Sequence, residues 1–130
     1  GKPLPDCAEV LPDGVSWKRC RIESYQTLLE ERAAGRVRSI GVSNFAPRHL
    51  DELAEVKAPH QLDIPAVHQF ELSPFWWDDA ILQRHSLDQA AMMAYGCLGG
   101  TPSGAPFLTL KGFRQIGERF GKTPAQVLYR

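Results

Sequence analysis

The chain has 130 residues, of which 43% are hydrophobic and 23% charged, a composition typical of one soluble domain. Fifteen Lys and Arg residues balance 15 Asp and Glu residues, so no charge excess indicates nucleic acid or an anionic membrane as a partner. The longest apolar runs fall short of the ~20 residues of a membrane-spanning helix. Three widely spaced cysteines fit neither a disulfide framework nor a zinc site, which favours a cytoplasmic protein without a metal.

The first half of the chain predicts two helices around one strand. Residues 1–23 are rich in proline and lack apolar periodicity, so we expect a loop. Residues 24–35 place apolar side chains at helical spacing and end on a glycine. Residues 37–43 are apolar and β-branched, typical of a buried strand. A second helix is expected over residues 47–58, with a proline at its first position.

The second half continues the alternation. Residues 65–72 are strand-like, and Asp78 or Asp79 is expected to start a helix over residues 80–85. Residues 91–95 predict a third strand.

The last third predicts a turn and two helices. Residues 99–104 form a turn-rich run, and residues 110–120 form an amphipathic helix closed by Gly121. Residues 123–126, Thr-Pro-Ala-Gln, form a capping box that starts a further helix. That helix stops at Arg130 with no terminal cap, from which we expect a truncated sequence.

Alternating strands and helices indicate right-handed βαβ units and a parallel sheet. Three strands cannot close a barrel, and a complete (β/α)₈ barrel takes ~250 residues. The pattern alone leaves two architectures open, a piece of such a barrel or an open doubly wound sheet.

Four segments carry a more specific signal. They are GRVRSIGVSNF at residues 35–45, followed closely by HLDEL; PAVHQFELSP at residues 65–74; AYGCLG at residues 94–99; and GKTPAQVL at residues 121–128. Their sequences, order and spacing resemble the aldo-keto reductase family over residues 24–130. The resemblance implies an α/β fold, namely a partial (β/α)₈ TIM barrel that lacks the first half and the last strand, preceded by the loop of residues 1–23.

The resemblance also implies an NADP(H) cofactor and the residues that contact it. Ser43, Asn44 and Gln69 would bind the nicotinamide carboxamide, which needs both a donor and an acceptor. Tyr95 would stack on the nicotinamide ring. The loop that would wrap the pyrophosphate comprises Gly96, Cys97 and Leu98.

Each position also has a purely structural interpretation. Ser43 and Asn44 could simply start the next helix, since both residue types are common at helix starts. Gln69 could be a hydrogen-bonded polar group inside a barrel mouth, and Tyr95 could be an ordinary core tyrosine. Trp76 and Trp77 follow a strand end, where they would line a substrate pocket or cover the next helix. The four histidines lack metal-ligand spacing and are expected to be solvated or to cap helices.

The chain departs from the family at several positions. His68 stands where the family has Asn, and Gly96-Cys97 where it has Ser-Pro. The family's catalytic Asp, Tyr, Lys and His belong to the first half of the barrel, so no catalytic residue is expected in this chain.

Two functions follow from the resemblance. The first is a fragment of an NADPH-dependent reductase that converts aldehydes or ketones, as small-molecule substrates, to alcohols by hydride transfer. The second is a non-catalytic pseudoenzyme or interaction protein of the same family. The exposed edges of the first and last strands would favour partner pairing.

Overall fold

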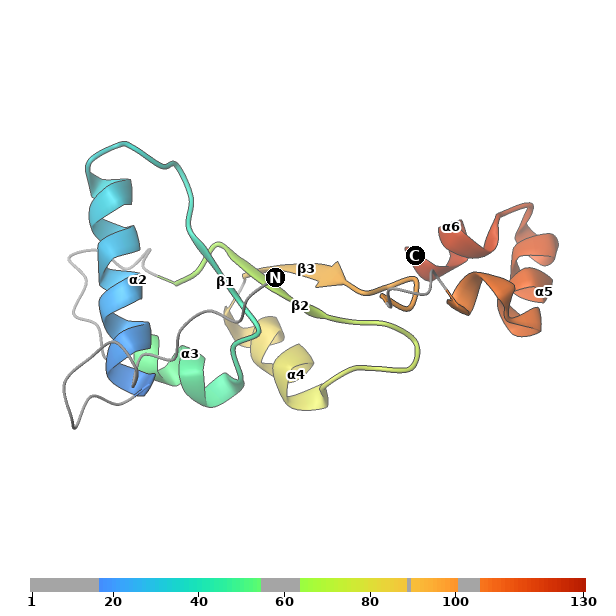
Figure 1. Cartoon of the computed structure of the whole chain (residues 1–130), viewed down its shortest axis with the longest axis horizontal. Coiled ribbons are helices and arrows are strands. Elements are labelled where there is room, and N and C mark those ends of the chain that lie inside the picture. Colours follow the sequence, from blue (N-terminus) through green and yellow to red (C-terminus); the bar gives the residue numbers. More distant parts are fainter. Residues whose placement is uncertain (1–16, 55–63, 89, 101–105) are drawn as a thin grey trace.

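A computed structural model describes residues 17–54, 64–88, 90–100 and 106–130. In chain order the elements are α2 (Trp17–Ala33), β1 (Gly41–Ser43), α3 (Pro47–Ala54), β2 (Val67–Glu71), α4 (Asp79–Asp88), β3 (Ala91–Tyr95), the 3₁₀ helix η1 (Pro106–Thr109), α5 (Lys111–Phe120) and α6 (Pro124–Leu128) (Figure 1). This order confirms the predicted alternation of strands and helices.

The three strands form one parallel sheet in the order β1-β2-β3. In its register Ser43 lies opposite Gln69, and Gln69 lies opposite Met93. Glu71 at the end of β2 lies opposite Tyr95 at the end of β3. The carboxyl ends of the strands therefore meet at one edge, the edge at which parallel sheets build their sites.

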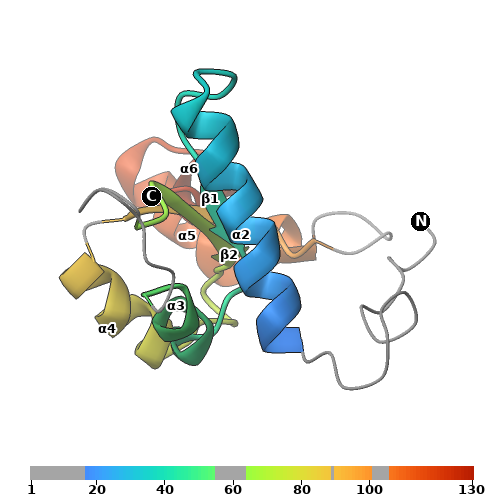
Figure 2. The ribbon, with the colours of Figure 1, turned by 90° about the vertical axis from the view of Figure 1, so that its left-hand side faces the viewer.

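One face of the sheet is covered by helices. Tyr25 of α2, Ile40 before β1 and Leu53 of α3 form a buried cluster, with Val42 packed against it. Phe70 of β2 is buried beside α4. Helix α2 lies alongside β1, at the opposite end of the molecule from α5 and α6 (Figures 1 and 2).

The other face of the sheet is open in the described part of the chain. Side chains alternate along a strand, so Ser43, Gln69, Glu71 and Tyr95 lie on the face opposite His68 and Phe70, and all four are exposed. Every residue of β3 is exposed, and β1 is buried at none of its three residues. The expectation of a buried strand was therefore wrong for β1, which within the described residues has a strand neighbour on one side alone.

Several element boundaries differ from expectation. Helix α2 begins at Trp17, so residues 17–23 are helical and not part of a loop, while residues 1–16 lie outside the described residues. Strand β1 pairs only from Gly41, and α4 continues to Asp88. Residues 55–63, including the predicted helix end before Pro59, are likewise outside the description.

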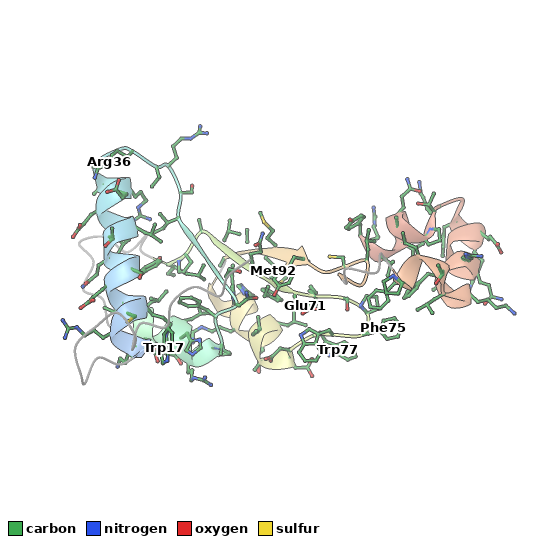
Figure 3. The ribbon with its side chains drawn as sticks, viewed as in Figure 1. Trp17, Arg36, Glu71, Phe75, Trp77 and Met92 are labelled. Carbon is green, nitrogen blue, oxygen red and sulfur yellow. The ribbon has the colours of Figure 1, made fainter. Side chains whose placement is uncertain are left out.

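The C-terminal helices form a separate pair beyond β3. Gly121 ends α5 with φ of 62°, and Thr123 and Gln126 form the predicted capping box at the start of α6. Phe75, on the loop after β2, connects this pair to the sheet: its ring centroid lies 4.9 Å from that of Phe107 and 6.0 Å from that of Phe113 (Figure 3).

Candidate functional site

The turn after β1 is held by three consecutive backbone N–H groups. The N–H of Asn44 donates to the carbonyl of Gln69 (2.9 Å), which extends the pairing of β1 with β2. The N–H of Phe45 donates to Nε2 of His68 (3.1 Å), and that of Ala46 to Nδ1 of His49 (3.1 Å). Asn44 itself has φ of 58°, a left-handed conformation that Asn tolerates better than most residues. The turn is therefore fixed at each of its residues.

This turn brings Asn44 to the end of β3. The hydroxyl of Tyr95 donates to Oδ1 of Asn44 at 2.8 Å, although 51 residues separate them. Between them in the sheet lies Gln69, whose Nε2 donates to Sδ of Met93 (3.0 Å). Ser43, opposite Gln69, is exposed on the same face. The four residues expected to hold a nicotinamide thus gather at one edge of the sheet.

A cavity of about 310 Å³ opens at this edge. It is lined by Asn44, Ala46, Phe70, Glu71, Trp76, Trp77, Asp78, Ile81 and Tyr95. Trp76 and Trp77, the expected substrate residues, therefore share a cavity with two of the expected cofactor residues. Both tryptophans are more than half exposed, so neither belongs to a buried core.

The loop before α4 is rigidly built. Ser73 and Trp76 exchange two backbone hydrogen bonds (2.8 and 3.1 Å), and Oδ1 of Asp78 accepts from the N–H groups of Ala80 (2.8 Å) and Ile81 (3.2 Å). Asp78 is thus the N-cap of α4, which confirms it as one of the two positions predicted to start this helix.

The glycine-rich loop follows directly after Tyr95. Gly96 and Gly99 have φ of 70° and 104°, and the N–H of Gly99 donates to the carbonyl of Gly96 (2.8 Å). A Cβ on Gly99 would lie 2.8 Å from the ring of Pro106. Cys97 and Leu98 are half-buried within this turn. Small residues and a tight turn suit close approach of a phosphate to backbone N–H groups.

A buried histidine pair lies behind this edge. Nδ1 of His68 is 2.7 Å from Nε2 of His85 on α4, and the ring of His85 stacks on Phe70 (centroids 5.5 Å apart). His68 is 0% exposed, and burial, followed by the charge of His85, lowers its pKa. The prediction that the histidines are solvated or cap helices is thus wrong for these two. It is correct for His49, which accepts from the N–H of Ala46 at the start of α3. His60 lies outside the described residues.

The sequence interpretation missed this pair. Its signal was the alternation of β2, which places position 68 on the opposite face from Gln69 and hence on the buried side. The partner at position 85 is 17 residues away, and no local pattern joins the two.

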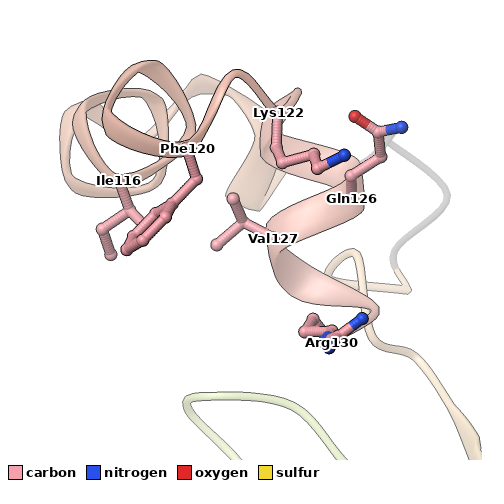
Figure 4. A pocket seen from close by; sticks show the side chains of 6 residues that line it. All are labelled: Ile116, Phe120, Lys122, Gln126, Val127 and Arg130. Atoms are coloured by element: carbon pink, nitrogen blue, oxygen red, sulfur yellow. The ribbon is translucent and has the colours of Figure 1, made fainter.

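A larger cleft of about 750 Å³ lies between α5 and α6, lined by Ile116, Phe120, Lys122, Gln126, Val127 and Arg130 (Figure 4). None of the predicted site residues lines it. It lies between two short helices, and its walls combine apolar side chains with the polar ones of Lys122, Gln126 and Arg130.

Other kinds of site are not seen in the described residues. They contain no cluster of three His, Cys, Asp or Glu side chains able to hold a metal ion, and none of their helices has the length and apolarity to cross a membrane. Cys20 and Cys97 form no disulfide within the same residues.

A parallel sheet with helices on one face and a polar site at its carboxyl edge defines an α/β protein of the barrel or doubly wound kind. Comparison with solved structures decides between the two. An aldo/keto reductase from Brucella melitensis superimposes with a TM-score of 0.74 at 28% identity, over 88% of this chain and 41% of that one. A Gox0644 mutant crystallised with NADPH superimposes with a TM-score of 0.70 at 31% identity, over 82% of this chain and 36% of that one.

Sequence relatives agree. An aldo-keto reductase of Mycolicibacterium smegmatis is 38% identical over 110 residues, 84% of this chain and 37% of that protein. No protein-family model matches the chain. The chain belongs to the aldo-keto reductase family, and its fold is part of a (β/α)₈ barrel. It spans about two fifths of the length of the relatives it matches.

Proposed function

We propose that this chain supplies the nicotinamide-binding wall of an NADPH-dependent aldo-keto reductase that reduces aldehydes or ketones to alcohols. One observation carries the proposal: the contact between Tyr95 and Asn44, with Ser43 and Gln69 opposite each other in the neighbouring strands. This arrangement places an aromatic ring beside amide and hydroxyl groups at a strand edge.

The residues fit the nicotinamide end of the cofactor. A carboxamide offers two N–H donors and one carbonyl acceptor, and the side chains of Asn44 and Gln69 each offer both functions. Both lie exposed on the open face, so a ligand reaches them without displacing a buried group. Tyr95 and Met93 form hydrogen bonds with these polar groups, and we infer that a carboxamide exchanges with them.

Each residue of the wall then has a defined task. Ser43, Asn44 and Gln69 bind the carboxamide and set the rotation of the ring, while Tyr95 stacks on one ring face and leaves the other for the substrate. Gly96, Cys97 and Leu98 approach the pyrophosphate through their backbone. NADPH, when bound, supplies the hydride. Trp76 and Trp77 line the space where a carbonyl substrate would lie.

The test is a titration of the 130-residue chain with NADPH at millimolar concentration, followed by NMR. We expect weak binding that shifts the signals of Asn44, Gln69 and Tyr95, and no loss of NADPH absorbance with an added aldehyde. Tyr95→Phe, which keeps the ring, should retain the shifts, whereas Tyr95→Leu should lose most of them.

Tyr129→Leu is the matched control, because Tyr129 is exposed and lies on the distant C-terminal helix pair. It should bind like the parent chain. Shifts confined to the cleft between α5 and α6 would contradict the proposed wall. Genuine aldehyde reduction would show that a proton donor lies within this chain, against the expectation that it holds no catalytic residue.

The non-catalytic alternative is favoured by a different observation, the exposure of β3 along its whole length. A strand open on both faces suits pairing with another polypeptide. The gene sequence preceding Gly1 distinguishes the two functions: strands carrying the family's Asp, Tyr, Lys and His support the reductase, and their absence supports the interaction protein.

A further inference from the structure

The hydrogen bonds around the buried pair fix its tautomers. The N–H of Phe45 donates to Nε2 of His68, so that nitrogen carries no proton. The neutral ring of His68 then holds its proton on Nδ1 and donates it to Nε2 of His85, 2.7 Å away. The proton of His85 is left on its Nδ1, which is buried and has no hydrogen-bond partner in the described part of the chain.

This network has no place for another proton. A proton added to Nε2 of His68 would face the N–H of Phe45, and one added to Nε2 of His85 would face the N–H of His68. Either position replaces a hydrogen bond by two opposed donors. A charge would also have to remain in a site where His68 is 0% exposed. The pair is therefore compatible with the folded turn only when both rings are neutral.

The bond to Phe45 connects the pair to the proposed cofactor wall. Phe45 directly follows Asn44, whose left-handed conformation needs support from its surroundings. Loss of the Phe45 bond would leave the turn held by the N–H groups of Asn44 and Ala46 alone. Because Asn44 accepts from Tyr95, a shift of the turn would move both residues relative to each other.

We propose that His68 and His85 are a positioning pair, which holds the Ser43–Phe45 turn in its binding geometry and releases it when His68 takes up a proton. The functional part of this inference rests on the proposed cofactor wall. The chain would then hold its nicotinamide-binding groups in place near neutral pH and lose that order in weak acid.

Among the side chains that the structure describes around the pair, none supplies a compensating acid. The titratable and charged ones are Arg48, His49, Asp51 and Glu52 on α3, Glu71 on β2, Arg84 and the exposed Asp79 on α4, and Tyr95 on β3. Asp51 pairs with Arg84 and Glu52 pairs with Arg21, while Glu71 lies on the opposite face of the sheet.

The sign of the pH effect follows from the lowered pKa. The unfolded chain takes up a proton at His68 near the ordinary value of 6.5, and the folded chain does so at lower pH. The stabilisation is thus fully present above that ordinary value, and it falls as the pH drops toward the lowered pKa.

The experiment is an NMR titration of the 130-residue chain between neutral pH and weak acid, with ¹⁵N-labelled histidine rings and backbone. We expect His68 to be the Nδ1–H tautomer at neutral pH, and the amide signals of Asn44 and Phe45 to move in step with protonation of His68. A His68 with its proton on Nε2, or a Phe45 amide that follows His49 instead, would overturn the proposal.

Two variants sharpen the result. His68→Gln keeps an acceptor for Phe45 but cannot be protonated, so the Phe45 amide should no longer titrate. His49→Gln is the control. It replaces the group that accepts from the N–H of Ala46, and it should leave the titration of the Phe45 amide unchanged. If His68→Gln does not fold, the tautomer and the titration of the unaltered chain still decide the matter.

NADPH binding adds a functional readout. The shifts that NADPH causes should weaken several-fold from neutral to weakly acidic pH in the parent chain and stay nearly constant in His68→Gln. Equal pH dependence in the two chains would overturn the positioning role. Absence of NADPH shifts at every pH would instead contradict the proposed cofactor wall. The tautomer of His68 would then still test whether the histidine pair positions the turn.

Discussion

Asn44 meets two requirements at one position. Its backbone adopts φ of 58°, and its side chain accepts the hydroxyl of Tyr95. A glycine would satisfy the first requirement and an alanine neither. The position therefore allows the cost of the backbone conformation to be separated from the side-chain contact.

We expect Asn44→Ala to lower the free energy of unfolding by about 1 kcal/mol more than Asn44→Gly, because a Cβ disfavours the left-handed region. Both variants lose the bond to Tyr95, so their difference isolates the backbone. Urea unfolding followed by circular dichroism measures it. An alanine variant as stable as the glycine variant would show that the turn relaxes to a negative φ.

The residues of the site were accessible from sequence to different degrees. Asn44 and Tyr95 stand within short motifs at strand ends, where the chain itself fixes their position, so both could be assigned to one edge before the fold was known. The contact between them, and the buried pair of His68 and His85, depend on strand register and on helix packing across many residues. Local pattern does not determine such contacts.

At the scale of elements, α2 and α3 are joined by a bidentate ion pair. Nε of Arg21 lies 2.7 Å from Oε2 of Glu52, and a second guanidinium nitrogen lies 3.0 Å from Oε1. Both side chains are largely shielded, in contrast to the exposed pair of Arg19 and Glu23 within α2. The hydrogen bond from Arg21 lowers the pKa of Glu52.

We expect Glu52→Gln to destabilise the chain at neutral pH and to have little effect in acid. A carboxyl whose pKa is lowered by folding stabilises above its unfolded value, here 4.5, and loses this contribution as the pH falls through the folded value. Thermal unfolding at several pH values measures the difference. Glu23→Gln is the control and should show a smaller difference, because its pair is solvent-exposed. Equal effects of the two substitutions would contradict the structural role of Arg21.

The two glycines of α5 form a second matched pair. A Cβ on Gly117 would lie 2.3 Å from the carbonyl oxygen of Lys122, whereas a Cβ on Gly112 would meet nothing within 4 Å. We expect Gly117→Ala to destabilise the α5–α6 pair by on the order of 1–3 kcal/mol. Gly112→Ala should stabilise α5 by roughly 0.5–1 kcal/mol through helix propensity.

Hydrogen exchange of the α5 and α6 amides, compared between the two variants, measures these changes without requiring one transition for the whole chain. Unchanged exchange in Gly117→Ala would show that the two helices do not pack through Gly117. Faster exchange in Gly112→Ala would contradict the expected gain in helix propensity.

The elements themselves were largely predictable, and the errors have physical causes. Strand β3 was placed correctly at residues 91–95 because its apolar run is bounded by polar residues and glycine. The predicted start of helix α2 was too late because residues 17–23 are rich in charged side chains and show no apolar stripe. In the structure, the buried Cys20 and the ion pair of Arg21 with Glu52 hold this part of the helix. Burial of β1 was overestimated because an apolar sequence shows what a strand can bury, not whether a neighbouring element covers it.

At the scale of the whole molecule, the edge strand β3 exposes two large apolar side chains. Met92 and Met93 lie on opposite faces of β3 and are 52% and 48% exposed. The helices described here cover one side of β1 and β2 but leave β3 open (Figure 1). Apolar side chains beside an unpaired strand edge favour association between chains.

We expect the 130-residue chain to self-associate through β3 as its concentration rises, because edge pairing and burial of both methionines act together. Replacing both residues, Met92→Lys with Met93→Lys, should keep the chain monomeric to higher concentration, since two charges would have to be desolvated at the contact. Sedimentation velocity over a concentration series measures the change. Phe120→Lys is the control: Phe120 is 67% exposed but lies on α5, away from the strand edge. If that substitution, and not the pair on β3, abolished association, the cleft between α5 and α6 would be the contact surface instead of the sheet.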